Sequence, residues 1–252
     1  MMPSKKKLYL SKFKAAAVHG AISLIIAVLI GNVIFFFWYP SQMSEMLEGT
    51  KIYWLILIVE ICLGPLISLV IYNPEKSRKE LLRDYTIVAV MQLSALFYGL
   101  YAVAQSRPVY IVFVKDRIEI MTPVELDDID LQEASLQYQN FSWYGPIQVC
   151  TESPTDSVEK SDLIFSALSG KDIQHYPKYY RACKEEEIIE KTYQGKRLYK
   201  ILEESSKRDI DSLPSFEFTW LPVKHRFGVW VKIFPKGQNQ GSYFLPINPF
   251  SN

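Results

Sequence analysis

The amino-acid sequence predicts a membrane protein in which a three-helix transmembrane bundle is followed by an extracytoplasmic α+β domain. Three long apolar runs lie within residues 15–105, and residues 1–105 hold only 10 Lys and Arg and 6 Asp and Glu. Residues 106–252 hold the other 18 basic and 21 acidic residues, as expected of a water-soluble fold. An aromatic content of 14% excludes a disordered chain, and a net charge of +1 argues against a nucleic-acid-binding protein.

The three apolar runs have the length and composition of membrane spans. Residues 15–39 and 85–105 contain no charged side chain, and residues 52–72 contain only Glu60. About 20 helical residues cross a hydrocarbon core about 30 Å thick. A backbone in lipid must satisfy its own hydrogen bonds, so each run is predicted to be a helix. The first run is too long for a cleaved signal peptide, and no small-residue cleavage site follows it.

The loops predict the orientation of the spans. Basic residues gather in residues 1–14 and in the loop 73–84, whereas the loop 40–51 has a single Lys at its edge. Because basic loops stay in the cytoplasm, the N-terminus and the loop 73–84 are predicted to be cytoplasmic. The loop 40–51 and the domain 106–252 are then predicted to lie on the opposite side of the membrane.

Polar residues occur at one level in the predicted bundle. Counted from the outer ends of the spans at about 1.5 Å per residue, Asn32, Glu60 and Tyr98 lie at similar depths. An ionised Glu60 would be costly in lipid. We therefore expect a hydrogen-bonded cluster of the three side chains, in which Glu60 is protonated or shares a proton. The alternative is that each is placed independently and that Glu60 meets water.

Small residues recur in helical register along all three spans. They allow membrane helices to approach closely, and Pro65 is expected to bend the second span. The stripes serve either packing within the bundle or a groove for a helix of another protein. The candidate residues are Ser23, Ala27, Gly31, Gly64, Ser68, Ala95 and Gly99.

The exported half alternates between predicted strands and helices. A hairpin is expected at 109–121, a short helix at 126–136, and a helix capped by Thr155 or Asp156 that runs to Leu168. A longer amphipathic helix is expected over 183–205, although Gly195 weakens it. Three strands then follow at 216–223, 228–234 and 242–247.

The chain has three cysteines, which excludes a disulfide-dense scaffold. Cys150 and Cys183 both lie in the exported half, where an oxidising compartment would let them pair. The alternative is that both are free thiols buried as small apolar residues.

No motif for catalysis, metal binding or cofactor binding is found. The three histidines lack partners at ligand spacing, and the acidic run Asp127, Asp128 and Asp130 lacks the glycine and the terminal glutamate of a calcium loop. That run is interpreted as a solvated surface. A serine nucleophile with His175 or His225 stays open, but the sequence predicts a protein that is not an enzyme and has no cofactor.

Three segments resemble the TfpX/TfpZ family of type IV pilin accessory proteins of Gram-negative bacteria. They are WYP at 38–40, GPLISLVIYNPEKSRKELLRD at 64–84 and QLSALFYGLYAVAQSRPVYIVFVKDRIEI at 92–120. The likeness continues through DIQHYPKYY at 172–180 and LPINPF at 245–250. The family often has Pro-Trp where this chain has Pro249-Phe250. Gln92, in the densest part of the likeness, joins the candidate helix-packing residues.

The resemblance implies an inner-membrane protein with a periplasmic domain. It implies a cognate type IV pilin as partner, whose stability, presentation or assembly the chain would support, and no catalytic residues. Other inner-membrane components of pilus assembly, and the lipid bilayer, are further expected partners. Two alternatives belong to other classes: a membrane-anchored periplasmic sensor that binds a ligand, and an envelope enzyme that modifies pilin.

Overall fold

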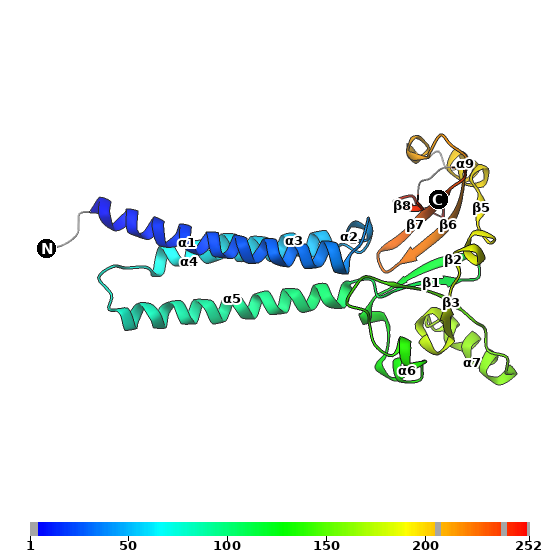
Figure 1. The fold of residues 1–252 in the computed structure, drawn as a ribbon, viewed down its shortest axis with the longest axis horizontal. Helices are drawn as coiled ribbons and strands as arrows, with labels where there is room; N and C mark the ends of the chain where they lie inside the picture. Colours follow the sequence, from blue (N-terminus) through cyan, green and yellow to red (C-terminus); the bar gives the residue numbers. More distant parts are fainter. Residues whose placement is uncertain (1–4, 205–207, 238–240, 251–252) are drawn as a thin grey trace. The chain divides into compact units, whose positions relative to one another are not determined.

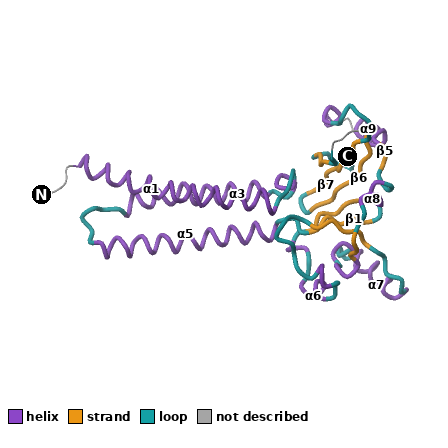
Figure 2. Tube along the Cα trace, in the orientation of Figure 1, coloured by secondary structure: helices purple, strands orange, loops and turns teal. Residues whose placement is uncertain are grey.

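The protein was analysed as a computed structural model, which describes residues 5–204, 208–237 and 241–250 (Figure 1). The chain forms two compact units. The first comprises residues 1–37 and 48–105, and the second comprises residues 38–47 and 106–252. The first unit is helical and the second is built on a sheet (Figure 2).

Three helices in the described part of the chain are long and apolar enough to cross a membrane, by length and composition: Leu8–Trp38, Gly49–Ile71 and Arg78–Ser106. The predicted runs 15–39, 52–72 and 85–105 fall on these three helices. The first consists of α1 (Lys5–Asn32) and the π-helical turn η1 (Val33–Trp38), and the third is α5 (Arg78–Ser106).

The second of these helices changes type in its middle. It consists of α3 (Gly49–Ile58), the π-helical segment η2 (Val59–Leu63) and α4 (Gly64–Ile71). Pro65 has no N–H to donate to the preceding turn, and a π-helical turn accommodates such a break in the helical ladder. A π-helical segment thus ends at Leu63, two residues before Pro65, and the bend expected at Pro65 stays a prediction.

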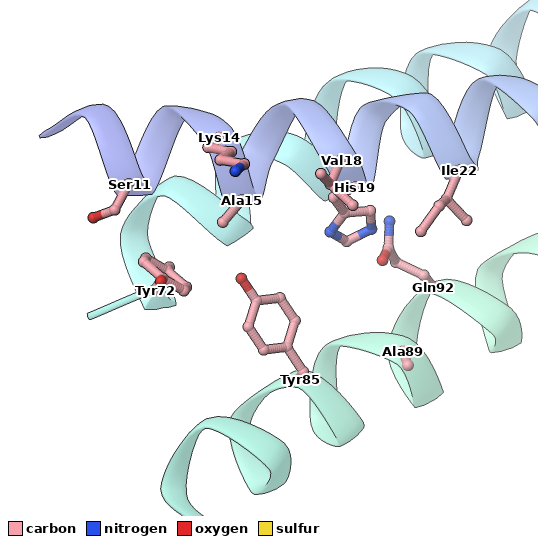
Figure 3. Close-up of a pocket in the computed structure, with 10 residues that line it drawn as sticks. All are labelled: Ser11, Lys14, Ala15, Val18, His19, Ile22, Tyr72, Tyr85, Ala89 and Gln92. Atoms are coloured by element: carbon pink, nitrogen blue, oxygen red, sulfur yellow. The ribbon is translucent and has the colours of Figure 1, made fainter. Parts of the chain in front are cut away.

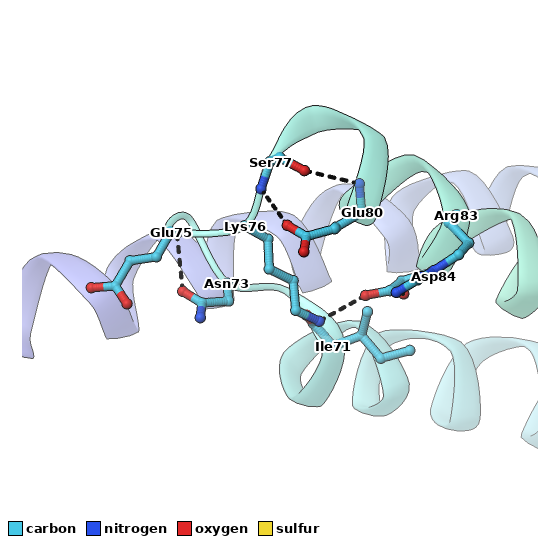
Figure 4. A network of polar contacts seen from close by, with 8 residues as sticks. All are labelled: Ile71, Asn73, Glu75, Lys76, Ser77, Glu80, Arg83 and Asp84. Carbon is cyan, nitrogen blue, oxygen red and sulfur yellow. Dashed lines mark hydrogen bonds and ion pairs between the residues drawn. The ribbon is translucent and has the colours of Figure 1, made fainter.

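A polar network begins α5 (Figure 4). The backbone N–H of Glu80 donates to Ser77 Oγ at 3.3 Å, and the backbone N–H of Ser77 donates to Glu80 Oε2 at 2.8 Å. This reciprocal pair is a capping box, which satisfies two free donors of the first turn. Lys76 Nζ reaches across the turn to Asp84 Oδ2 at 2.7 Å and to the carbonyl oxygen of Ile71 at 3.3 Å. The connection at 72–77 therefore has a defined structure that fixes the end of α4 to the start of α5. The second half of the expected loop 73–84 is the beginning of α5.

The second unit contains a mixed sheet with the strand order β4-β3-β1-β2-β6-β7-β8, and β5 pairs with β6. Its strands are β1 (Tyr110–Val114), β2 (Arg117–Met121), β3 (Ile147–Thr151), β4 (Tyr180–Ala182), β5 (Tyr193–Gln194), β6 (Phe218–His225), β7 (Gly228–Pro235) and β8 (Tyr243–Leu245). The β1–β3 and β2–β6 pairs are parallel, and the other pairs are antiparallel.

Helices and short 3-10 turns fill the connections of the second unit. The helices are α2 (Met43–Met46), α6 (Asp128–Gln132), α7 (Ser157–Leu168), α8 (Glu185–Ile189) and α9 (Gly195–Glu204). The 3-10 turns are η3 (Pro123–Glu125), η4 (Leu136–Tyr138), η5 (Ile173–His175), η6 (Pro177–Tyr179) and η7 (Arg208–Ser212).

Local sequence signals predict several of these elements. The expected hairpin is β1 and β2, with Tyr110 opposite Met121 and with Lys115 at the turn in the left-handed region at φ 54°. Asp156 caps α7 as expected, because its carboxylate accepts from the backbone N–H groups of Val158 and Glu159, both at 2.9 Å. The three expected C-terminal strands correspond to β6, β7 and β8.

The prediction of a single amphipathic helix over 183–205 is wrong. The chain there divides into α8, β5 and α9, because Tyr193 and Gln194 leave the helix to pair with Trp220 and Thr219 of β6. Gly195 makes this possible. A side chain there would place its Cβ 2.9 Å from the carbonyl oxygen of Phe218. The helix expected over 126–136 is also shorter and covers only α6.

Two hydrophobic clusters support the sheet. One surrounds β1, β3 and the connections after β2, and includes Val109, Tyr110, Val112, Val149 and Tyr180. The other lies between α9 and strands β6 and β7, and includes Leu198, Leu202, Trp220, Val231 and Ile233. The second unit therefore has its own buried core, as a water-soluble fold requires.

Residues 38–47, which join the first two candidate spans, belong to the sheet unit rather than to the helices. Gln42 Oε1 accepts from the backbone N–H of Phe244 in β8 at 3.2 Å. The side chains of Tyr39, Met46 and Leu47 are at most 1% exposed. Burial also raises the pKa of Tyr39 well above its usual value, although Arg107 opposes this effect. The segment expected to be a short loop is thus an integral part of the sheet unit.

Candidate helix-binding site

The small residues of the first two candidate spans are buried by packing inside the helical unit. Ser23, Ala27 and Ser68 are at most 3% exposed, and Gly31 and Gly64 are also buried. The hydroxyl of Tyr53 donates to the carbonyl oxygen of Ala27 at 2.8 Å. These residues therefore do not line an open groove. Of the two alternatives, they serve packing within the helical unit.

Close approach explains the glycines of the stripes. A Cβ at Gly31 would lie 2.5 Å from the Tyr53 hydroxyl oxygen, and one at Gly99 would lie 2.7 Å from Ile56 Cγ1. A Cβ at Gly64 would collide with the Gln92 amide. Ala95, in contrast, is exposed on α5. The third helix thus keeps Ala95 exposed, whereas the candidate small residues of the first two spans are all buried.

The structure does not bring Asn32, Glu60 and Tyr98 together. Asn32 Nδ2 donates to the carbonyl oxygen of Val28 in its own helix at 2.7 Å, and Tyr98 is 76% exposed. Glu60 is 5% exposed, and its Oε1 atom has no hydrogen-bond partner among the described residues. Depth alone predicted the cluster, and the rotation of each helix about its axis directs the three side chains apart.

A different set of polar side chains meets inside the helical unit. His19 Nδ1 shares a hydrogen bond of 2.5 Å with Ser68 Oγ, and Gln92 points towards His19 (Figure 3). The Gln92 Nε2 atom is buried and has no acceptor among the described residues. Of these three, His19 is not among the predicted site residues. Its signal in the sequence is a lone imidazole within an apolar run.

His19 and Gln92 line a cavity of about 650 Å³ between α1, the end of α4 and α5 (Figure 3). Its lining residues are Ser11, Lys14, Ala15, Val18, His19, Ile22, Tyr72, Tyr85, Ala89 and Gln92. The Tyr85 hydroxyl points into the cavity (Figure 3). Ser68 is 1% exposed and is not part of the lining, so its hydroxyl serves His19 rather than the cavity.

The apolar side chains of the three long helices are mostly exposed. In the most apolar windows of these helices, only 22%, 22% and 17% of the residues are buried. Large apolar side chains such as Leu29, Val70 and Phe97 are more than half exposed. Such a surface is compatible with insertion into a membrane, because water disfavours exposed apolar side chains.

Cys150 and Cys183 form a disulfide in the structure, with their Cα atoms 4.9 Å apart. The bond joins β3 to the residue after β4. Of the two alternatives, the structure therefore has the paired one. The remaining cysteine, Cys62, is free and exposed in η2.

The acidic run after β2 is held by a lysine rather than fully solvated. Lys171 Nζ donates to Asp127 Oδ2 and to Asp130 Oδ2, both at 2.5 Å, and Asp130 is 9% exposed. Burial opposes the charge of Lys171, but the two hydrogen bonds still raise its pKa above its usual value. The interpretation of this run as a solvated surface is wrong for Asp130.

The two other histidines lie in separate places. His225, on β6, is 8% exposed and packs edge-on against Trp230, and burial lowers its pKa to about 4. His175 Nδ1 lies 3.2 Å from the carbonyl oxygen of Asp172. Among the described residues, no group of three or more His, Cys, Asp or Glu could hold a metal ion.

Comparisons with known proteins identify the family of the chain. Residues 7–46 match the family model described as Fimbrial assembly protein FimB. The fimbrial assembly protein of Dichelobacter nodosus serogroup I is 30% identical over 181 residues, which cover 72% of this chain and 70% of that protein. The one of serogroup E1 is 28% identical over 243 residues, which cover 93% and 95%.

A third relative, the fimbrial assembly protein of Dichelobacter nodosus serogroups C1 and C2, is 36% identical over 117 residues, which cover 46% of this chain and 89% of that protein. No solved structure matches the chain significantly. The narrower TfpX/TfpZ assignment stays a prediction. The broader family assignment is established by an identity of 30% over more than two thirds of a relative. The chain belongs to the fimbrial assembly protein family.

Proposed function

We propose that this chain is a non-enzymatic accessory protein of the bacterial inner membrane that binds a cognate type IV pilin and supports its stability, presentation or assembly. Membership of the fimbrial assembly protein family supports a role in assembly. The resemblance of residues 64–120 to type IV pilin accessory proteins supports pilin as the partner.

The proposed topology has a cytoplasmic N-terminus and a periplasmic sheet unit. The basic loop at 73–84 and the scarcity of basic residues in 40–51 support it. The disulfide between Cys150 and Cys183 fits a sheet unit in an oxidising compartment.

The observation that carries the proposal is the cavity between α1 and α5. It opens within the apolar part of the chain, and one of its lining residues, Gln92, has a buried amide nitrogen, Nε2, without an acceptor among the described residues. A buried donor without a partner is costly, and a polar atom on an incoming helix would satisfy it. We propose that the apolar helix of the pilin packs between α1 and α5 at this cavity.

A second contact would come from the sheet unit. A pilin held in the membrane by its helix presents its globular part outside, where the sheet unit would contact it. Two weak contacts on one molecule reinforce each other through effective concentration, and each can still release the subunit. This arrangement suits a protein that must hold a pilin briefly and then pass it on.

Site-specific photocrosslinking in cells that make the cognate pilin tests the proposal. A photoreactive residue in place of Ile22 or Ala89, both in the cavity lining, is expected to capture pilin. A photoreactive residue in place of Val70 is the matched control, because this α4 side chain is 78% exposed but does not line the cavity. Equal capture from Val70 and Ile22 would contradict the cavity as the binding site. The absence of pilin from all three adducts would contradict the proposed partner.

A further inference from the structure

The loop before β3 is fixed to residues that directly follow the third candidate span. Phe141 packs its ring edge-on against Tyr110, with the ring centroids 6.3 Å apart. At the other end of the loop, the backbone N–H of Ile147 donates to the carbonyl oxygen of Val109 at 2.9 Å. The third candidate span ends at Ser106. Both ends of the loop are thus held within a few residues of the end of that helix.

An arginine joins this loop to the end of the first candidate span as well. The guanidinium carbon of Arg107 lies 5.4 Å from the centroid of the Trp38 ring and 5.9 Å from that of Trp143. The two indole rings are 6.2 Å apart. Trp38 is the last residue of the first candidate span, and Arg107 is the first residue after the third. The indole of Trp143 therefore lies at the level where two spans end.

The tip of the loop is aromatic and exposed. Trp143 is 68% exposed and Tyr144 is 79% exposed. The turn is ordered, because Ser142 Oγ accepts from the backbone N–H of Tyr144 at 3.0 Å and Gly145 takes φ 67°, which favours glycine. Phe141 points into the core while the next two aromatic residues point outward, so their exposure is built into the turn.

We propose that Trp143 and Tyr144 form a membrane-interface anchor that inserts into the phospholipid headgroup layer beside the ends of the first and third spans. Indole and phenol rings combine an apolar body with a polar N–H or O–H, and they concentrate at the headgroup level of membranes. The contacts of Trp143 with Trp38 and Arg107 put the loop tip at that level. The anchor would hold the sheet unit against the bilayer, and it requires no partner protein.

The natural cysteines allow a direct test in the full-length chain. The variant Cys62→Ala with Tyr144→Cys offers one reactive thiol, because Cys150 and Cys183 are paired. The matched control is Cys62→Ala with Leu168→Cys, since Leu168 is 80% exposed on α7 and Tyr144 is 79% exposed. The unmutated chain, labelled at the exposed Cys62, reports a position within a span. Each protein would be spin-labelled and reconstituted alone in vesicles of phosphatidylethanolamine and phosphatidylglycerol.

The readout is collision of the nitroxide with oxygen, which is enriched in lipid, and with a water-soluble nickel chelate. We expect the oxygen-to-nickel ratio at position 144 to lie above that at 168 and below that at 62. Adding Trp143→Ser is expected to shift the label at 144 towards water, whereas adding Leu168→Ser leaves it unchanged. Equal ratios at 144 and 168 would overturn the anchor. So would a label at 144 that leaves water only when purified pilin is added, because this would assign the loop to a protein contact.

Discussion

The helical and sheet units handle their apolar side chains in opposite ways. The sheet unit buries them in two clusters, with Leu198, Leu202 and Val231 fully buried. The long helices leave most of theirs exposed, and at most 22% of the residues in their most apolar windows are buried. The sheet unit therefore buries its apolar side chains in its own core, whereas the long helices expose an apolar surface and border a cavity between α1 and α5.

A second difference lies within the helical unit. The first two candidate spans interlock through small residues, as Gly31 against Tyr53 illustrates. α5 meets the second span at Gly99 but leaves a cavity of about 650 Å³ towards α1. The first two candidate spans thus pack closely and form what we call the scaffold. α5 packs less closely against α1 and forms what we call the open side of the unit.

The largest expected effect is the loss of stability when a buried tryptophan of the sheet unit is replaced, compared with an exposed one. Trp220 is 1% exposed and donates from Nε1 to the carbonyl oxygen of Gln194 at 3.2 Å, so Trp220→Ala should lower the free energy of unfolding by about 3–5 kcal/mol. Trp143→Ala should lower it by only about 1 kcal/mol, because this exposed side chain loses just its ring contacts with Trp38 and Arg107. Urea unfolding in detergent, followed by fluorescence, measures both. Similar losses for the two variants would remove the distinction between core and surface.

The next effect concerns the disulfide of the sheet unit. Replacing Cys150 and Cys183 together by alanine opens a loop of 33 residues, which should lower the free energy of unfolding by about 3–4 kcal/mol. Cys62→Ala is the control, because Cys62 is free and exposed in the helical unit. The same urea titration under non-reducing conditions compares the variants. An unchanged midpoint in the double variant would mean that the bond does not stabilise the folded state.

A smaller effect is expected when a substitution in the interlocked first two spans is compared with one on α5. Gly31→Ala would place a methyl group 2.5 Å from the Tyr53 hydroxyl oxygen, so we expect a loss of about 1–3 kcal/mol from overpacking. Ala95→Val adds volume on an exposed part of α5 and should be nearly neutral. Unfolding in mixed micelles of increasing SDS content compares the two. A larger loss for Ala95→Val would reverse the assignment of scaffold and open side.

The last effect is a pH dependence that arises in the sheet unit and is absent at neutral pH. Burial lowers the pKa of His225 from 6.5 to about 4, so the folded state binds its proton less readily than the unfolded state. Stability from the neutral imidazole is complete above pH 6.5 and declines as the pH falls from 6.5 towards 4. In the variant His225→Gln, the urea midpoint should therefore change less with pH over this range than in the unmutated chain. Parallel curves for the two proteins would exclude His225 as the source of the decline.

Elements with a strong local signal are predictable from the sequence. The three apolar runs, the hairpin of β1 and β2, and α7 with its Asp156 cap occur where they are expected. The helix expected over 183–205 failed because pairing with β6 outweighs local helix propensity at Tyr193 and Gln194. A sequence pattern records propensity along one segment and does not include the competing strand.

The candidate site is less predictable than the fold. Gln92 is on the predicted list and His19 is not, yet both line the cavity. The expected cluster of Asn32, Glu60 and Tyr98 relied on depth in the membrane, which follows from residue count. It failed because the direction of each side chain depends on how its helix is rotated against its neighbours.

The sequence alone determined which segments suit lipid and which suit water, because length, charge and apolar content set the cost of transfer between the two. It also determined where the chain turns and where α7 begins, since these depend on near neighbours. Only the tertiary structure decided that residues 38–47 join the sheet unit, that the small residues of the first two spans are consumed internally, and that α5 borders a cavity. These features depend on contacts between residues far apart in the chain, which no local pattern encodes.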